Sequence, residues 1–135
     1  MRFMTIVKHA EGAPVVPPKP LIEAINQLAE EATKAGCVMV GNGGLLPINE
    51  GTRIRLAGGR LTVTDGPFTE AKEVIGGFAI FEAPSKADVV KWSTRFMDLH
   101  KVHMPGWEGE TEIRQMFGDG EPCGSGAESR VAEAV

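Results

Sequence analysis

The segment LTVTDGPFTEAKEVIGGFAIF, residues 61–81, decides the fold of this chain. Strand-like residues at 61–64, three of them β-branched, lead into Asp65-Gly66-Pro67, a combination typical of turns. Apolar, strand-like residues follow at 74–81. Several ionisable side chains lie between the two runs, so the segment joins a change of chain direction to groups that can take part in chemistry. We therefore expect two strands with a charged loop between them.

The residues just before this segment predict a β-hairpin. Two segments of alternating pattern, 52–56 and 60–64, are separated by Ala57-Gly58-Gly59, which supplies the chemistry of a tight turn. Their apolar side chains would cover a buried side of the hairpin: Ile54, Leu56, Leu61 and Val63. After the charged loop, Gly76-Gly77 inside a strand predicts a bulge or the close approach of another backbone or a ligand.

The N-terminal part of the chain predicts a strand, a loop and a helix. Residues 2–8 are mostly apolar or β-branched, whereas residues 12–20 contain four prolines and favour an extended loop. In residues 20–35, apolar side chains recur every three or four positions, which indicates an amphipathic helix. Gly36 is placed to end that helix.

The remaining elements complete an alternating order. Residues 37–41 predict a strand that Gly41-Asn42-Gly43-Gly44 ends. Ser85 is a typical N-cap for a second helix, which we expect to end near His100. Residues 110–117 predict the last strand. The order is β-α-β, a hairpin, then β-α-β, which is an α+β, ferredoxin-like pattern.

This pattern places both helices on one face of the sheet and leaves the other face uncovered. Because that face also carries apolar residues, we expect homodimerisation, sheet against sheet, into a closed dimeric α/β barrel. Residues 1–118 form the predicted domain. Residues 119–135 form a Gly-rich C-terminal tail, either mobile or packed on the partner subunit.

The composition is that of an ordinary globular domain. The chain has 135 residues, 42% hydrophobic and 24% charged, with a formal net charge of −4. This charge gives no argument for a nucleic-acid or anionic-membrane partner. Two cysteines make no disulfide framework, no signal peptide is evident, and no apolar run approaches the roughly 20 residues of a membrane helix. We expect a cytoplasmic protein in which Cys37 is buried.

Residues 63–73, followed by Gly76-Gly77-Phe78, resemble the DGPF family of the YCII-related superfamily, whose motif is usually written DGPFAETKE. Positions 69–71 read Thr-Glu-Ala here, where the usual form has Ala-Glu-Thr. The resemblance extends over roughly residues 1–117. It implies a ferredoxin-like fold and a dimer, without a single activity. Some relatives resemble accessory proteins of extracytoplasmic-function sigma factors, and others are enzymes of aromatic-ring degradation that use a His/Asp pair.

Three residues are candidates for catalysis: Asp65, Lys72 and His9. Asp65 either closes an Asx-turn or provides a carboxylate at the floor of a cleft, held ionised by Lys72. Lys72 either faces a ligand or joins a surface charge network with Glu70 and Glu73. His9 ends a strand, where functional residues often lie, and imidazole titrates near neutral pH. Its alternative is a solvated loop histidine.

Other residues have plainer interpretations. Phe68 is expected to anchor the core, and Trp107 to pack or to contact a partner subunit. The pair His100 and His103 has a helical spacing of three, but no third ligand follows at a metal-binding spacing. Because Gly41-Asn42-Gly43-Gly44 lacks the pattern of a phosphate or dinucleotide loop, no cofactor is predicted.

Two functions follow from these expectations. The first is a protein that binds a small molecule in a cleft beside the motif, with or without cofactor-free acid–base catalysis of the isomerase or lyase type on an aromatic or lactone-like substrate. The second is a non-catalytic dimeric module that regulates a sigma factor or another transcription partner. The first requires Asp65 and Lys72 in a concave pocket, whereas the second requires an exposed apolar patch.

Overall fold

The computed structural model describes residues 1–10, 16–66 and 73–118. The strands are β1 (Arg2–Ala10), β2 (Val38–Gly44), β3 (Thr52–Ala57), β4 (Arg60–Asp65), β5 (Glu73–Glu82) and β6 (Gly109–Gln115), and the helices are α1 (Lys19–Lys34), α2 (Lys86–His103) and a short 3-10 turn (Ile48–Glu50). In this described part, neither helix has the length and apolar character needed to cross a membrane. The expected tail, 119–135, lies outside the described residues.

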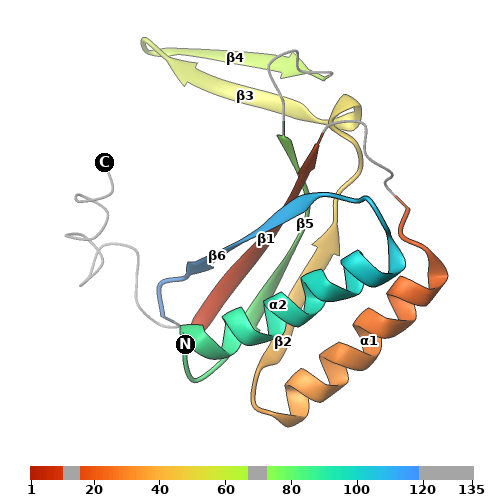
Figure 1. Ribbon diagram of the computed structural model, residues 1–135. Coiled ribbons are helices and arrows are strands. Elements are labelled where there is room, and N and C mark those ends of the chain that lie inside the picture. The colour runs from red at the N-terminus through yellow and green to blue at the C-terminus, as the bar shows by residue number, and fades with distance from the viewer. Residues whose placement is uncertain (11–15, 67–72, 119–135) are drawn as a thin grey trace.

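Four strands form one antiparallel sheet in the order β2-β5-β1-β6. Both helices lie against the same face of this sheet (Figure 1). The order and the one-sided helices are consistent with a ferredoxin-like fold, so the predicted α+β class is confirmed. The hairpin β3-β4 forms a separate two-stranded sheet.

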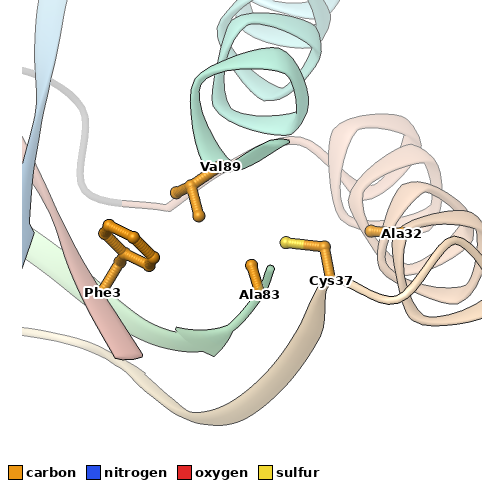
Figure 2. Packing of buried hydrophobic residues seen from close by; sticks show 5 residues of the cluster. All are labelled: Phe3, Ala32, Cys37, Ala83 and Val89. Atoms are coloured by element: carbon orange, nitrogen blue, oxygen red, sulfur yellow. The ribbon is translucent and has the colours of Figure 1, made fainter. Parts of the chain in front are cut away.

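The core lies where the two helices meet the sheet. Its fully enclosed members are Phe3, Ala32, Cys37, Ala83 and Val89, which come from both helices, from strand β1 and from the segments that flank β2 and β5 (Figure 2). The predicted burial of Cys37 is confirmed at 1% exposure. Each large side chain buried here contributes roughly 1.5–3 kcal/mol relative to an exposed one.

The helix ends follow the local chemistry that the sequence predicts. Gly36, with φ of 93°, follows the C-cap of α1, and its N–H donates to the Thr33 carbonyl while that of Cys37 donates to Ala32. At the start of α2, the Ser85 hydroxyl accepts from the Asp88 N–H at 3.2 Å. Helix α2 continues three residues past the predicted end, to His103.

The hairpin forms as predicted but does not bury its apolar side. Gly58 and Gly59 take positive φ values, 58° and 75°, which the tight turn requires. The four apolar side chains are 66–72% exposed: Ile54, Leu56, Leu61 and Val63. The expectation that these side chains cover a buried side is therefore wrong for the described residues of a single chain. The reason is that β3 and β4 pair with each other in a separate sheet, which extends beyond the main sheet (Figure 1).

Strand β2 continues through the glycines that were expected to end it. Gly43 pairs with Phe78 and Gly44 with Gly77 of strand β5. A Cβ on Gly43 would lie 3.2 Å from the Phe78 ring, so the small residue leaves room for the aromatic one. Sheet pairing has thus overridden the weak strand propensity of glycine. The predicted bulge is confirmed: the β1–β5 register shifts at Val7 and skips Gly76.

Candidate functional site

A cavity of about 420 Å³ lies between the helix-facing side of the sheet and the two helices. Strand β1 contributes Thr5, Val7 and His9 to its lining, because alternate residues of a strand face the same side. Helix α1 contributes apolar side chains, and helix α2 contributes Trp92, Phe96 and His100. The volume falls within the range of ligand pockets, roughly 300–1,000 Å³.

His9 is the predicted site residue that lines this cavity. Its Nδ1–H donates to the carbonyl of Ala10 at 2.8 Å, since a carbonyl can only accept. The ring lies over Gly76, where a Cβ would come within 2.6 Å of Nε2 and Cδ2. In the neutral imidazole, Nε2 is therefore the unprotonated nitrogen and can accept a proton or a hydrogen bond.

His100 is a second cavity residue, which the sequence suggested only as half of a metal pair. It is 9% exposed, and its Nδ1–H donates to the Phe96 carbonyl at 3.0 Å. Its ring contacts Phe96 and Trp107, with centroid distances of 4.6 and 4.7 Å. Trp107 thus packs as predicted. The available signal was the spacing of four after Phe96, which places His100 on the apolar stripe of α2.

His103 does not line the cavity, so the two histidines of the pair have different surroundings. Within the described ranges, no group of three or more His, Cys, Asp or Glu side chains is arranged to hold a metal ion.

Asp65 lies at the base of the hairpin, outside the cavity lining. It is exposed and accepts a hydrogen bond from the Thr52 hydroxyl at 2.8 Å, across the β3-β4 pair. The next residue, Gly66, packs against the backbone of Ile48, which does line the cavity. Lys72 and Phe68 lie outside the described residues. The structure does not bring Asp65 and His9 together in the cavity, because of the two only His9 lines it.

An ion pair that shifts the pKa of both partners lies on the helix-free face of the sheet. Lys8 Nζ and Glu112 Oε1 are 2.8 Å apart. Their hydrogen bond raises the pKa of Lys8 and lowers that of Glu112. On the helix side, burial raises the pKa of the Cys37 thiol, and the charge of Asp88 adds to this effect. Cys37 is therefore a protonated core residue at neutral pH and not a nucleophile.

Two solved structures are similar to this chain. They are amidases of the hydantoinase/carbamoylase family from Burkholderia vietnamiensis and Burkholderia multivorans, each 12% identical with a TM-score of 0.33. Each match covers 86% of this chain but only 27% of the amidase, so the chain spans about a quarter of those proteins. No curated protein matches this chain.

A family model matches more than half of the chain. The model of the YCII-related domain matches residues 1–96, which extend from β1 through most of α2. The matched residues include His9, the hairpin and the Gly76-Gly77 bulge. The chain therefore belongs to the YCII-related domain family.

Proposed function

We propose that this protein binds a small molecule in the cavity between its sheet and its helices, and that His9 exchanges a proton with that molecule. The observation that carries the proposal is the position of His9: it lines a mainly apolar cavity, and its Nε2 is available as an acceptor. Ligand sites commonly combine an apolar lining with a few placed polar groups.

If the protein is an enzyme, the chemistry is cofactor-free acid–base catalysis of the isomerase or lyase type. Nε2 of His9 would remove a proton from a C–H or O–H group of the ligand and return it elsewhere. The bond from Nδ1–H to the Ala10 carbonyl would orient the ring. We propose Asp65 and Lys72 as rim residues, since Gly66 contacts the lining residue Ile48 and Lys72 precedes strand β5 by one position.

The test is a thermal-shift panel of small metabolites, followed by fluorescence titration of each hit. Both tryptophans of the chain, Trp92 and Trp107, line the cavity, so a ligand bound there should change the intrinsic fluorescence. We expect His9→Ala to weaken a hit about tenfold, and His103→Ala to leave it unchanged. Lys72→Ala tests whether Lys72 acts as a rim residue of the cavity. Hits that leave the fluorescence unchanged and bind His9→Ala normally would refute the proposal.

The finer family assignment and the dimer are also proposals. The motif at residues 65–73 supports membership of the DGPF group within the YCII-related family. Support for a sheet-to-sheet homodimer comes from the helix-free face, where register places Met4 opposite Ile80 and alternation places Ile6 on the same side. Val38, opposite Glu82 at the sheet edge, is 37% exposed.

A second function, a non-catalytic accessory module for a transcription partner such as a sigma factor, is favoured by the exposed hairpin. Leu56 and Leu61 pair directly across β3-β4 and are 70% and 72% exposed. Contiguous exposed apolar side chains mark interaction surfaces. Sedimentation velocity of Leu56→Thr/Leu61→Thr, with Thr62→Ser on the same hairpin as control, tests this surface. The double variant should assemble or bind its partner less tightly without losing thermal stability. Unchanged association would exclude the hairpin as an interaction surface.

A further inference from the structure

The lining of the cavity carries no permanent charge in the part of the chain that the structure describes. None of its described residues is Asp, Glu, Lys or Arg. Apart from the two imidazoles, its polar side chains are Thr5, Asn26, Asn42, Ser93 and Thr111. An ionised group buried here without a counter-charge would lose several kcal/mol of solvation, whereas a neutral group would not. The described lining therefore favours a neutral ligand over a carboxylate, phosphate or ammonium ligand.

The two imidazoles that line this space are held in the same way, by backbone carbonyls. His9 donates through Nδ1 to the Ala10 carbonyl, and His100 donates through Nδ1 to the Phe96 carbonyl, at 2.8 and 3.0 Å. Each backbone carbonyl fixes the Nδ1–H tautomer of the neutral ring and leaves Nε2 as an acceptor. Neither Nε2 has a hydrogen-bond partner among the described residues.

The rings come from opposite walls and are held in place. His9 comes from strand β1 and lies over Gly76, while His100 comes from helix α2. The His100 ring lies near both Phe96 and Trp107, so its rotation is restricted by aromatic contacts as well as by its hydrogen bond. Pre-oriented acceptors lose little entropy when a ligand binds.

We propose that His100 is a ligand-binding residue that acts with His9, and that the ligand is a neutral, mainly apolar molecule bearing hydroxyl or N–H donors for the two Nε2 atoms. This inference rests on the proposed ligand-binding function and adds the chemical class and the second residue. A donor group on the ligand would bond to an acceptor that has no partner among the described residues, and its apolar body would replace water against the surrounding aliphatic and aromatic side chains.

Three matched probes of two-ring size test the chemical class. The first is 2-naphthol, which is neutral and carries a hydrogen-bond donor. The second is 2-methoxynaphthalene, which lacks the donor, and the third is 2-naphthoate, which is ionised. Equilibrium dialysis at neutral pH should show 2-naphthol binding about tenfold more tightly than either of the others, as expected for about 1.4 kcal/mol. Naphthoate binding as tightly as naphthol would overturn the assignment of a neutral ligand.

His100→Phe tests the second residue, because it keeps an aromatic ring beside Phe96 and Trp107 but removes Nε2. It should weaken 2-naphthol roughly two- to tenfold, the range for one neutral hydrogen bond, and leave 2-methoxynaphthalene within about twofold. His103→Phe, on the same helix but outside the cavity lining, is the matched control and should change neither. Unchanged naphthol binding in His100→Phe would refute the role of His100.

Two further measurements separate the possible failures. If His100→Phe does not fold, His100→Gln, which retains an acceptor, should keep part of the naphthol preference. Long-range proton–nitrogen spectra of the free protein should show both side chains as the Nδ1–H tautomer, and the other tautomer at His100 would contradict the inference directly. If none of the three probes binds, the proposed ligand-binding function fails and this inference with it. If all three bind equally, only the inference fails.

Discussion

The imidazole of His9 lies directly over the backbone of Gly76, and a Cβ at position 76 would come within 2.6 Å of its Nε2 and Cδ2 atoms. The bulge that skips Gly76 in the β1–β5 pairing brings these residues together. The missing side chain at position 76 is therefore what allows the His9 ring to occupy this part of the cavity wall.

Gly76→Ala should displace the His9 ring with little loss of stability, because the group that must move is the end of a side chain. We expect a melting temperature within a few degrees of wild type and about a tenfold loss of 2-naphthol affinity, comparable to that of His9→Ala. Calorimetric melting and equilibrium dialysis measure the two effects. Gly41→Ala is the control, because a Cβ there meets nothing within 4 Å and Gly41 is outside the cavity lining. Normal naphthol binding by Gly76→Ala would show that the ring position does not matter.

Gly77→Ala should act on stability instead of on the site. A Cβ on Gly77 would lie 2.9 Å from the carbonyl oxygen of Gly43 on the neighbouring strand, and backbone in a paired sheet cannot move aside cheaply. We expect a loss of about 1–3 kcal/mol in the free energy of unfolding, measured in urea. Gly44→Ala, on the strand opposite Gly77, should stay within about 0.5 kcal/mol. Equal losses in the two variants would contradict this account.

Local chemistry was sufficient to predict the turns and caps. Gly58-Gly59 in the hairpin turn, Gly36 after α1 and Ser85 before α2 each act through neighbours a few residues away. The glycines of β2 were misassigned, because what keeps them extended is pairing with Phe78 and its neighbours, which are distant in sequence.

The candidate site was predictable only in part, for the same reason. His9 could be proposed as a candidate from its place at a strand end. To propose His100, one has to know that the segment carrying Trp107 packs against α2. Asp65 was singled out by its motif, yet its hydroxyl partner, Thr52, is defined by the hairpin register. The exposure of Ile54 shows that an alternating pattern identifies an apolar face without identifying what covers it.

The Lys8–Glu112 pair should make stability depend on pH in the acid range. The folded-state pKa of Glu112 lies below the ordinary value of 4.5, so its contribution is complete above that value and is lost as the pH falls through the folded pKa. The difference in unfolding free energy between wild type and Glu112→Gln should therefore shrink on acidification. The control is Glu110→Gln. This change removes another carboxylate near Lys8, one that makes no described ion pair with Lys8. A difference that is constant or grows in acid would exclude the pair as its source.

The opposite sign applies to Lys8. Its folded-state pKa is raised above 10.5 by the hydrogen bond to Glu112, so its contribution is present below that value and is lost as the pH rises through the folded pKa. Both groups are substantially solvated, so salt should reduce the effect. Urea unfolding of wild type and Glu112→Gln at low and high ionic strength measures this screening, and a difference insensitive to salt would contradict it.

Cys37 should be protected from thiol reagents by the fold. It is 1% exposed, and burial raises its pKa, so the reactive thiolate is both rare and enclosed at neutral pH. A Cys123→Ser variant retains Cys37 as its one thiol. Modification of this variant by Ellman's reagent should be at least ~100-fold slower in buffer than in denaturing urea, because the reaction requires opening of the core. Val89→Ala, which removes packing beside Cys37, should speed the reaction in buffer without changing the rate in urea. A fast reaction in buffer would place Cys37 outside the core.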